Sequence, residues 1–366
     1  MFPRGRVTVT IVAAVAALVA VGGLAIVLLP HSHAKAASHS ATTQAEVLRV
    51  ASVMPAADAQ GVNGAAPIRL TLAQDVTGVT AHSALPVISP AIPGSWHQDG
   101  TDLTFTPATG FAPRTHVTIT VPHQTWTASF TTGDYSLLRL QQLLGQLGYL
   151  PLSWAAELGD SVTADDAGAQ LSAAYEPPAG TFSWQSGYPW SLRGFWQPGQ
   201  MNQITTGAIM AFESDHGMKM DGQASAGVWK ALLRAAAGQD VNRHGYTYAI
   251  ARQYQPESLT IWHDGREVFH SYANTGIPVS PTAVGTFPVY LRYRFQIMQG
   301  TNPDGSRYAD PVQFVSYFHG GEAVHYFPRY SYGWEQSLGC VELPLGAASQ
   351  AWPYLTYGSL VTVTPE

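Results

Sequence analysis

The sequence predicts a multidomain chain: an N-terminal transmembrane helix, an all-β sandwich, a small α-helical domain with an insertion, and a C-terminal mainly-β domain. Three observations predict this order. A long uncharged run opens the chain, apolar residues then alternate with polar ones, and this alternation gives way to helical spacing before it returns. A length of 366 residues also favours two to four domains over one.

Residues 1–30 are expected to form a transmembrane anchor or a signal. Two arginines precede an uncharged run from Val7 to Leu29. A bilayer is crossed by ~20 apolar residues, whereas the apolar core of a cleaved signal has ~7–15. Length favours a retained anchor with the rest of the chain outside the cytoplasm. Cleavage near Ala34–Ala36, which would give a secreted protein, is the alternative. Residues 31–45 are small and polar and predict a flexible linker.

Residues 46–132 are predicted to form a β-sandwich. Apolar and polar residues alternate in Ile68–Leu72 and in Val117–Val121, and proline and glycine clusters separate such runs. The stretches Pro93–Trp96 and Phe105–Pro107 resemble bacterial immunoglobulin-like domains. No catalytic cluster is visible here, and we expect the domain to act as a spacer.

Residues 134–240 show helical spacing of apolar residues. Three stretches resemble the three-helix peptidoglycan-binding domain: Leu140–Leu150, Gly207–Phe212 and Asp221–Trp229. An insertion at residues 151–203 separates the first stretch from the second. Its aromatic residues either pack against a neighbouring domain, which we favour because buried rings supply most packing area, or form a stacking platform for sugars or peptides. They are Trp154, Tyr175, Trp184, Tyr188, Trp190 and Trp196.

Residues 246–366 return to strand patterns, beginning with a hairpin predicted around Asp264-Gly265. Asp304 and Asp310 lack a metal-binding pattern around them, so neither a metal nor another cofactor is expected. The net charge of −6 and the absence of a basic cluster argue against nucleic-acid binding.

The single cysteine of the chain, Cys340, marks the candidate site. It cannot form an intramolecular disulfide, so it is either a small buried apolar residue or a reactive group. The glycine-flanked Ser337–Cys340 turn favours reactivity, because backbone N–H groups can converge there. His325 lies fifteen positions upstream and is a candidate base. His319 precedes Gly320-Gly321 at a hairpin tip, where a side chain is poorly fixed, so His325 is favoured.

Val324-His325 followed by Ser337–Val341 resembles the L,D-transpeptidase catalytic domain. The sequence departs from the family pattern at Leu338, Glu342 and Tyr326. The residue at 342 bears on how charged groups of the substrate are held.

The resemblance implies that Cys340 is the nucleophile and His325 the general acid and base. The backbone carbonyl of Tyr326 would orient the imidazole, and the N–H groups of Gly339 and Cys340 would stabilise an oxyanion. Ser337 would brace the turn or contact substrate. Further substrate contacts are expected from four residues: Tyr317, Trp334, Leu338 and Glu342.

The implied reaction cross-links the diamino-acid residues of two peptidoglycan stem peptides through a cysteine acyl-enzyme. Donor and acceptor stems would be the partners, together with the inner membrane, and carbapenem-type inhibitors should acylate Cys340. Two alternatives remain. Water in place of the acceptor amine gives an L,D-carboxypeptidase, and an inactive catalytic domain gives a membrane-tethered wall-binding protein.

Overall fold

The computed structural model describes residues 48–74, 85–163 and 165–365. The predicted anchor at residues 1–30 and the predicted linker at 31–45 lie outside these ranges. Within the described ranges, no helix combines the length and apolar character needed to span a membrane.

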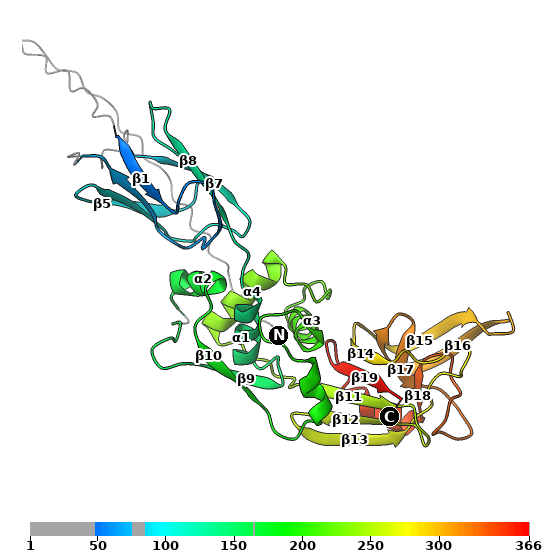
Figure 1. Cartoon of the computed structure of the whole chain (residues 1–366). Coiled ribbons are helices and arrows are strands. Elements are labelled where there is room, and N and C mark those ends of the chain that lie inside the picture. The colour runs from blue at the N-terminus through cyan, green and yellow to red at the C-terminus, as the bar shows by residue number, and fades with distance from the viewer. Residues whose placement is uncertain (1–47, 75–84, 164, 366) are drawn as a thin grey trace, which may run out of the picture. The chain divides into compact units, whose positions relative to one another are not determined.

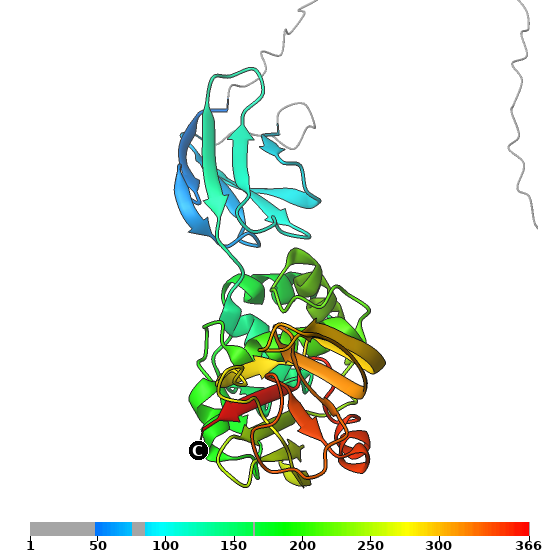
Figure 2. The same ribbon diagram turned by 90° about the vertical axis from the view of Figure 1, so that its right-hand side faces the viewer.

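Residues 50–132 contain two β-sheets that share one hydrophobic core (Figure 2). Their orders are β1-β3-β6-β5 and β2-β8-β7-β4. Ile68 and Leu70 from the first sheet meet Val117 and Ile119 from the second, and all four side chains are fully buried. The predicted alternation therefore produces a sandwich. The strands are β1 (Val50–Met54), β2 (Ala59–Val62), β3 (Ile68–Leu72), β4 (Val87–Ser89), β5 (Gly94–Asp99), β6 (Asp102–Pro107), β7 (His116–Thr120) and β8 (Thr127–Thr132).

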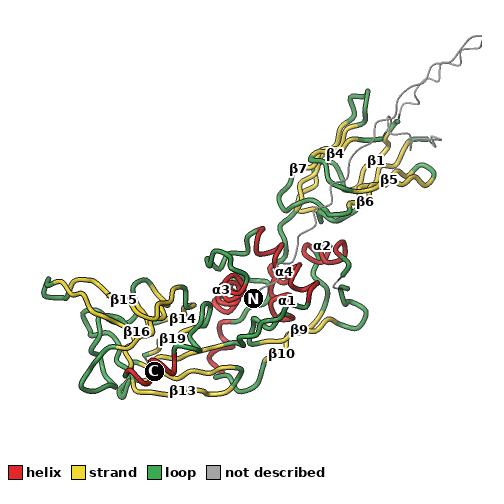
Figure 3. The backbone as a smooth tube through the Cα atoms, turned by 180° about the vertical axis from the view of Figure 1, so that it is seen from behind, coloured by secondary structure: helices red, strands yellow, loops and turns green. Residues whose placement is uncertain are grey.

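Helices occur at the three places where the sequence predicts them, and they lie close together (Figure 3). They are α1 (Leu137–Gln146), α3 (Gln203–Asp215) and α4 (Ala226–Gly238). Asn202 caps α3 and Ser225 caps α4, each accepting a backbone N–H with its side chain. The buried carboxylate of Glu213 accepts the N–H groups of Asp221 and Gly222 at 2.9 Å, which fixes the turn between these two helices.

The insertion has secondary structure of its own: β9 (Leu152–Ala156), α2 (Ala167–Tyr175), β10 (Gly180–Trp184) and a 3₁₀-helix, η1 (Trp190–Phe195). Strands β9 and β10 pair antiparallel. Trp154 is buried, and Tyr188 and Trp196 pack against the core of the helices, as the packing interpretation expects. Trp190 is different, because 77% of its surface is exposed.

The C-terminal region contains two further sheets (Figure 1). The five-stranded sheet has the order β13-β12-β11-β19-β14, and the four-stranded sheet has the order β15-β16-β17-β18. A second core of buried side chains, including Ala249, Val324, Val341 and Val361, joins them. The elements are β11 (Thr247–Arg252), β12 (Ser258–His263), β13 (Arg266–Tyr272), β14 (Gly285–Pro288), β15 (Leu291–Thr301), β16 (Arg307–His319), β17 (Glu322–Tyr326), β18 (Val341–Leu343), α5 (Leu345–Ala351) and β19 (Leu360–Thr364).

Strand β11 has buried side chains on both faces. Ala249 and Ala251 face the core between the two C-terminal sheets, whereas Tyr248 and Ile250 belong to the core of the helices. Gly207 of α3 also lies directly against the β19 end of the sheet, since a Cβ at this position would come within 2.5 Å of the Gly358 carbonyl oxygen. The helical region and the five-stranded sheet therefore share one hydrophobic core.

Candidate active site

Cys340 and His325 line the same cavity, which has a volume of about 670 Å³. The parallel pairing of β17 with β18 explains this. It places His325 opposite Glu342, and the side chain of Cys340, two residues before Glu342, falls on the same face. Strands β15 and β16, the turn that joins them and the loop between β17 and β18 also contribute to the wall. Two segments fifteen residues apart in sequence are thus brought into one site.

Ser337 holds the turn that presents the nucleophile. Its fully buried Oγ donates to the carbonyl oxygen of Cys340 at 2.6 Å and accepts the N–H of Gly339 at 3.1 Å. Gly339 has φ = 111°, a conformation that side chains disfavour. The Gly339 N–H, which is expected to stabilise an oxyanion, donates to Ser337 in this structure, so that role stays a prediction. The other expected donor is the Cys340 N–H.

The thiol of Cys340 is neutral at rest. Burial raises its pKa to about 12, and the nearby Glu342 and Glu322 add to this, while the Ala323 N–H opposes it by favouring the thiolate. Sγ lies 3.9 Å from the carbonyl oxygen of Gly321, to which the thiol can donate. A base must take the thiol proton during the reaction.

His325 is suited to be that base. Its Nδ1 lies 2.9 Å from the carbonyl oxygen of Tyr326. A carbonyl can only accept, so Nδ1 carries the proton and Nε2 keeps a free lone pair. Burial lowers the imidazole pKa below its ordinary value, against the opposing effects of the Tyr326 carbonyl and of Glu342, and Arg329 lowers it further. The ring is therefore neutral, and able to accept a proton, at neutral pH.

Arg329 is a residue of the site that the sequence analysis did not identify. Its Nε and Nη2 donate to the two carboxylate oxygens of Glu342 at 2.8 and 2.9 Å, and Nη2 also donates to the Gln336 carbonyl oxygen at 2.8 Å. Both members of this ion pair line the cavity. The sequence contained one indication of this ion pair, the glutamate two residues after the cysteine. Once such a carboxylate is buried, it requires a cation. Glu342, which is 4% exposed, thus holds Arg329 with both oxygens.

The other predicted substrate contacts separate into two groups. Tyr317 and Leu338 line the cavity, and the Tyr317 hydroxyl donates to Gln296 Oε1 at 3.0 Å. Trp334 is 46% exposed and is not among the residues that line this cavity, so its contact with substrate stays a prediction. The residue lies in the loop between β17 and β18, whose path sequence alternation does not determine.

His319 ends β16 at the tip of a hairpin. Its Nδ1 lies 3.4 Å from Glu322 Oε2, and it is not among the residues that line the cavity of Cys340. Within the described ranges, no group of three or more histidine, cysteine, aspartate or glutamate side chains could hold a metal ion. Asp304 and Asp310 instead line the wall of the Cys340 cavity.

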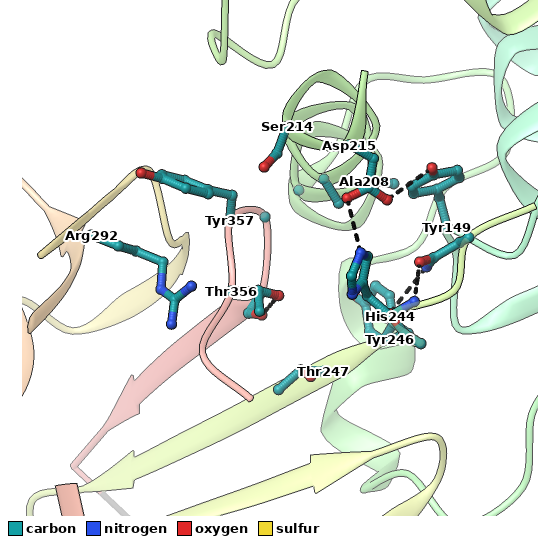
Figure 4. Close-up of a pocket in the computed structure, with 16 residues that line it drawn as sticks. Tyr149, Ala208, Ser214, Asp215, His244, Tyr246, Thr247, Arg292, Thr356 and Tyr357 are labelled. Carbon is teal, nitrogen blue, oxygen red and sulfur yellow. Dashed lines mark hydrogen bonds and ion pairs between the residues drawn. The ribbon is translucent and has the colours of Figure 1, made fainter. Parts of the chain in front are cut away.

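A second cavity, of about 270 Å³, lies between α3 and the segments around residues 245 and 357 (Figure 4). The hydroxyl of Tyr149 donates to Asp215 at 3.0 Å, and Nε2 of His244 lies 3.6 Å from the other oxygen of the same carboxylate. Its lining residues include no cysteine, and its histidine is paired with Asp215. This cavity shares no lining residue with the cavity of Cys340.

Two known families match parts of the chain. The L,D-transpeptidase catalytic domain matches residues 247–363, and the bacterial Ig-like domain matches residues 44–133. No curated protein matches the sequence.

Several solved structures are similar at low sequence identity. An L,D-transpeptidase from Mycobacterium smegmatis is 15% identical, and the match covers 87% of this chain and 99% of that one with a TM-score of 0.31. L,D-transpeptidase 3 from Mycobacterium tuberculosis in complex with a faropenem-derived adduct is 16% identical over 86% and 98%, with a TM-score of 0.31. The catalytic domain of the E. faecium L,D-transpeptidase is 23% identical over 34% and 100%, with a TM-score of 0.30.

With TM-scores this low, the solved structures say nothing about the site, and the two family matches identify the domains. Those matches agree with the two regions in which the structure has a β-sandwich and a cavity that holds the only cysteine. Residues 247–363 of this chain form an L,D-transpeptidase catalytic domain, and a bacterial Ig-like domain precedes it.

Proposed function

We propose that this L,D-transpeptidase cross-links the diamino-acid residues of two peptidoglycan stem peptides through an acyl-enzyme on Cys340. One observation carries the proposal. In a domain of this family, the only cysteine of the chain and a buried, neutral histidine with a fixed tautomer line a single cavity. That pair is what a two-step acyl transfer requires.

In the first step, Cys340 Sγ attacks the carbonyl carbon of the diamino-acid residue in a tetrapeptide stem. Nε2 of His325 takes the thiol proton as the carbon–sulfur bond forms. The Cys340 N–H stabilises the negative oxygen of the tetrahedral intermediate. The carbon–nitrogen bond then breaks, and the terminal D-alanine leaves with its amine protonated by His325. A thioester on Cys340 remains.

In the second step, the side-chain amine of another stem attacks the thioester. His325 takes a proton from this amine, an amide bond forms, and the sulfur leaves and recovers the proton. Ser337 keeps the turn in place throughout, and the Tyr326 carbonyl keeps Nε2 directed at the reaction. Tyr317 and Leu338 form part of the cavity wall against which the stem peptides lie.

Glu342 places a carboxylate close to the sulfur of Cys340. The ion pair with Arg329 compensates the negative charge of this carboxylate. Glu342 raises the pKa of the Cys340 thiol, and an unpaired carboxylate would raise it more. The pair also ties the loop after β17 to β18. We assign it a positioning role.

We further propose that residues 1–30 anchor the protein in the cytoplasmic membrane with the catalytic domain on the cell-wall side. The uncharged length of Val7–Leu29 and the preceding arginines support this. The helices of residues 134–240 are proposed to bind peptidoglycan. Membrane fractionation of the full chain tests the anchor: recovery of intact protein only in the soluble fraction would overturn it.

Carbapenem acylation tests the reactive site. The β-lactam carbonyl should react with Cys340, so the mass of the intact full chain should increase by one inhibitor. Cys340→Ala should gain no mass, and His325→Ala should react about 10²–10⁴-fold more slowly because the base is gone. Tyr330→Ala is the matched control, since Tyr330 is fully exposed and does not line the cavity. A wild-type chain that stays unmodified would overturn the proposal.

A further inference from the structure

A third cavity, of about 660 Å³, lies at the aromatic insertion. Four aromatic side chains line it: Trp154, Phe182, Trp184 and Trp196. Phe182 pairs directly with Trp154 across the antiparallel strands β9 and β10. Trp184 lies two residues after Phe182, so it falls on the same face. This aromatic face of the strand pair, together with Trp196, lines the cavity that we call the aromatic groove.

The rings of the aromatic groove are held in place before any ligand arrives. Trp154 is 8% exposed, and its ring lies against the backbone of Gly180, where a Cβ would come within 2.6 Å of it. The rings of Phe182 and Trp196 meet edge to face, with centroids 5.1 Å apart. The guanidinium of Arg193 covers Trp184 at 5.2 Å. A rigid apolar surface of this kind binds with little loss of side-chain entropy.

The groove also has hydrogen-bonding groups that a ligand can reach. At the rim, Glu157 and Thr181 are exposed and also line the groove. The groove thus combines flat apolar rings with a few hydrogen-bonding groups, as small-molecule sites do.

The chemistry of the lining distinguishes between the possible ligands. The one charged side chain that lines the aromatic groove is the carboxylate of Glu157, and the guanidinium groups of Arg193 and Arg139 lie against the rings of Trp184 and Trp154. Charges of both signs therefore lie beside the groove, and the surface that a ligand meets consists mainly of flat, uncharged rings. An uncharged N-acetylated sugar fits such a surface. The C–H face of a sugar ring packs on an indole, and its hydroxyl and acetamido groups reach the polar rim.

We propose that the aromatic groove binds the glycan strand of peptidoglycan through uncharged N-acetylated sugar rings stacked on Trp184 and Trp196. The choice of polymer rests on the proposed function. None of the groove's lining residues lines the cavity of Cys340, so this is a separate site. Glycan held here raises the effective concentration of the attached stems at the catalytic domain. Its loss should raise KM for polymeric substrate more than it lowers kcat.

The test is calorimetric titration of the full chain with oligomers of N-acetylglucosamine, and separately with a free stem tetrapeptide. Trp184→Ala and Trp196→Ala should each weaken glycan binding by about tenfold or more, because each removes a stacked ring. Trp184→Leu keeps apolar bulk but removes the flat face, and should weaken binding to a similar degree with a smaller loss of thermal stability. Leu158→Ala is the control, because Leu158 is a fully exposed apolar residue of the same insertion that does not line the groove.

Binding that Leu158→Ala weakens as much as the groove variants do, or that Trp184→Leu leaves unchanged, would overturn the proposal. Preference for the tetrapeptide over the glycan, or no glycan binding at all, would do so too. Carbapenem acylation of the wild-type chain is measured beside the titrations. An acylated chain that fails to bind glycan refutes only the groove, whereas glycan binding by a chain that is never acylated refutes the proposed catalysis.

Discussion

Cys340 and His325 face one cavity as neutral groups, since burial disfavours the charged form of each. An enzyme with a preformed thiolate–imidazolium pair would need the opposite shifts. Here the proton must move as the sulfur attacks. The reactivity of this site therefore depends on a histidine that is already deprotonated, with Nδ1 fixed by the Tyr326 carbonyl.

This arrangement predicts a pH profile. The pKa of His325 is lowered from 6.5, so the base form persists below that pH and is lost only when the pH falls through the lower value. Carbapenem acylation of wild type should fall off on the acid side with a midpoint below 6.5. His325→Ala should lack this acid limb. A midpoint at or above 6.5 would show that the histidine is not desolvated as described.

Arg329→Ala should be strongly destabilising. The Glu342 side chain is 5% exposed, and without Arg329 its charge has no partner, which costs about 3 kcal/mol in buried pairs. The added negative charge should also slow acylation by raising the pKa of the thiol. Urea denaturation and acylation rates measure the two effects.

A second substitution separates charge from packing in this pair. Adding Glu342→Gln to Arg329→Ala removes the unpaired charge, so it should recover part of the lost stability and rate. Tyr330→Ala, in the same loop, should change neither. A double variant as impaired as the single one would mean that the guanidinium acts through its packing.

At the scale of the elements, the joint between α3 and the catalytic sheet depends on two glycines. Gly207→Ala would place a methyl group 2.5 Å from the Gly358 carbonyl oxygen, a backbone atom that cannot move aside alone. The free energy of unfolding should fall by roughly 1–3 kcal/mol, the cost of overpacking. Gly238→Ala on α4 is the control. It has open space around it, so it should be neutral or slightly stabilising. Equal effects of both substitutions in urea denaturation would contradict a close contact at this joint.

Periodicity and local chemistry predicted these elements well. Alternation located β3 (Ile68–Leu72) and β7 (His116–Thr120), and helical spacing located α1, α3 and α4. The motif around Cys340 and His325 likewise indicated two side chains that the structure places in one cavity.

What the sequence could not provide depends on non-local packing. Arg329 meets Glu342 across a loop whose path no pattern determines. The Gly339 N–H points to Ser337 because of one turn's geometry. The aromatic residues at 151–203 indicated packing, but only the pairing of β9 with β10 gathers several of them on one face.

At the scale of the whole molecule, one face of the five-stranded catalytic sheet packs against the helices, and only the other face packs within the catalytic domain. Tyr248, Ile250 and Leu360 are buried together with side chains of the helices. Residues 246–366 expressed alone would expose this apolar face to water. At about 25 cal/mol per Å² of apolar area, three large side chains represent several kcal/mol, comparable to the stability of a small domain.

We therefore expect the isolated fragment 246–366 to aggregate or to unfold without a cooperative transition, whereas the full chain should unfold cooperatively in urea. Circular dichroism and size-exclusion chromatography check this. A monomeric fragment with a sharp transition at the same urea concentration as the full chain would show that the helices contribute nothing to the sheet.

The most direct measurement of the central claim is mass spectrometry of the products formed from a single stem tetrapeptide. Wild type should yield a dimer whose mass is twice that of the tetrapeptide minus one alanine, together with free D-alanine. Cys340→Ala should yield neither. A tripeptide as the sole product would indicate trimming in place of cross-linking, and dimer formation by Cys340→Ala would contradict the acyl-enzyme account.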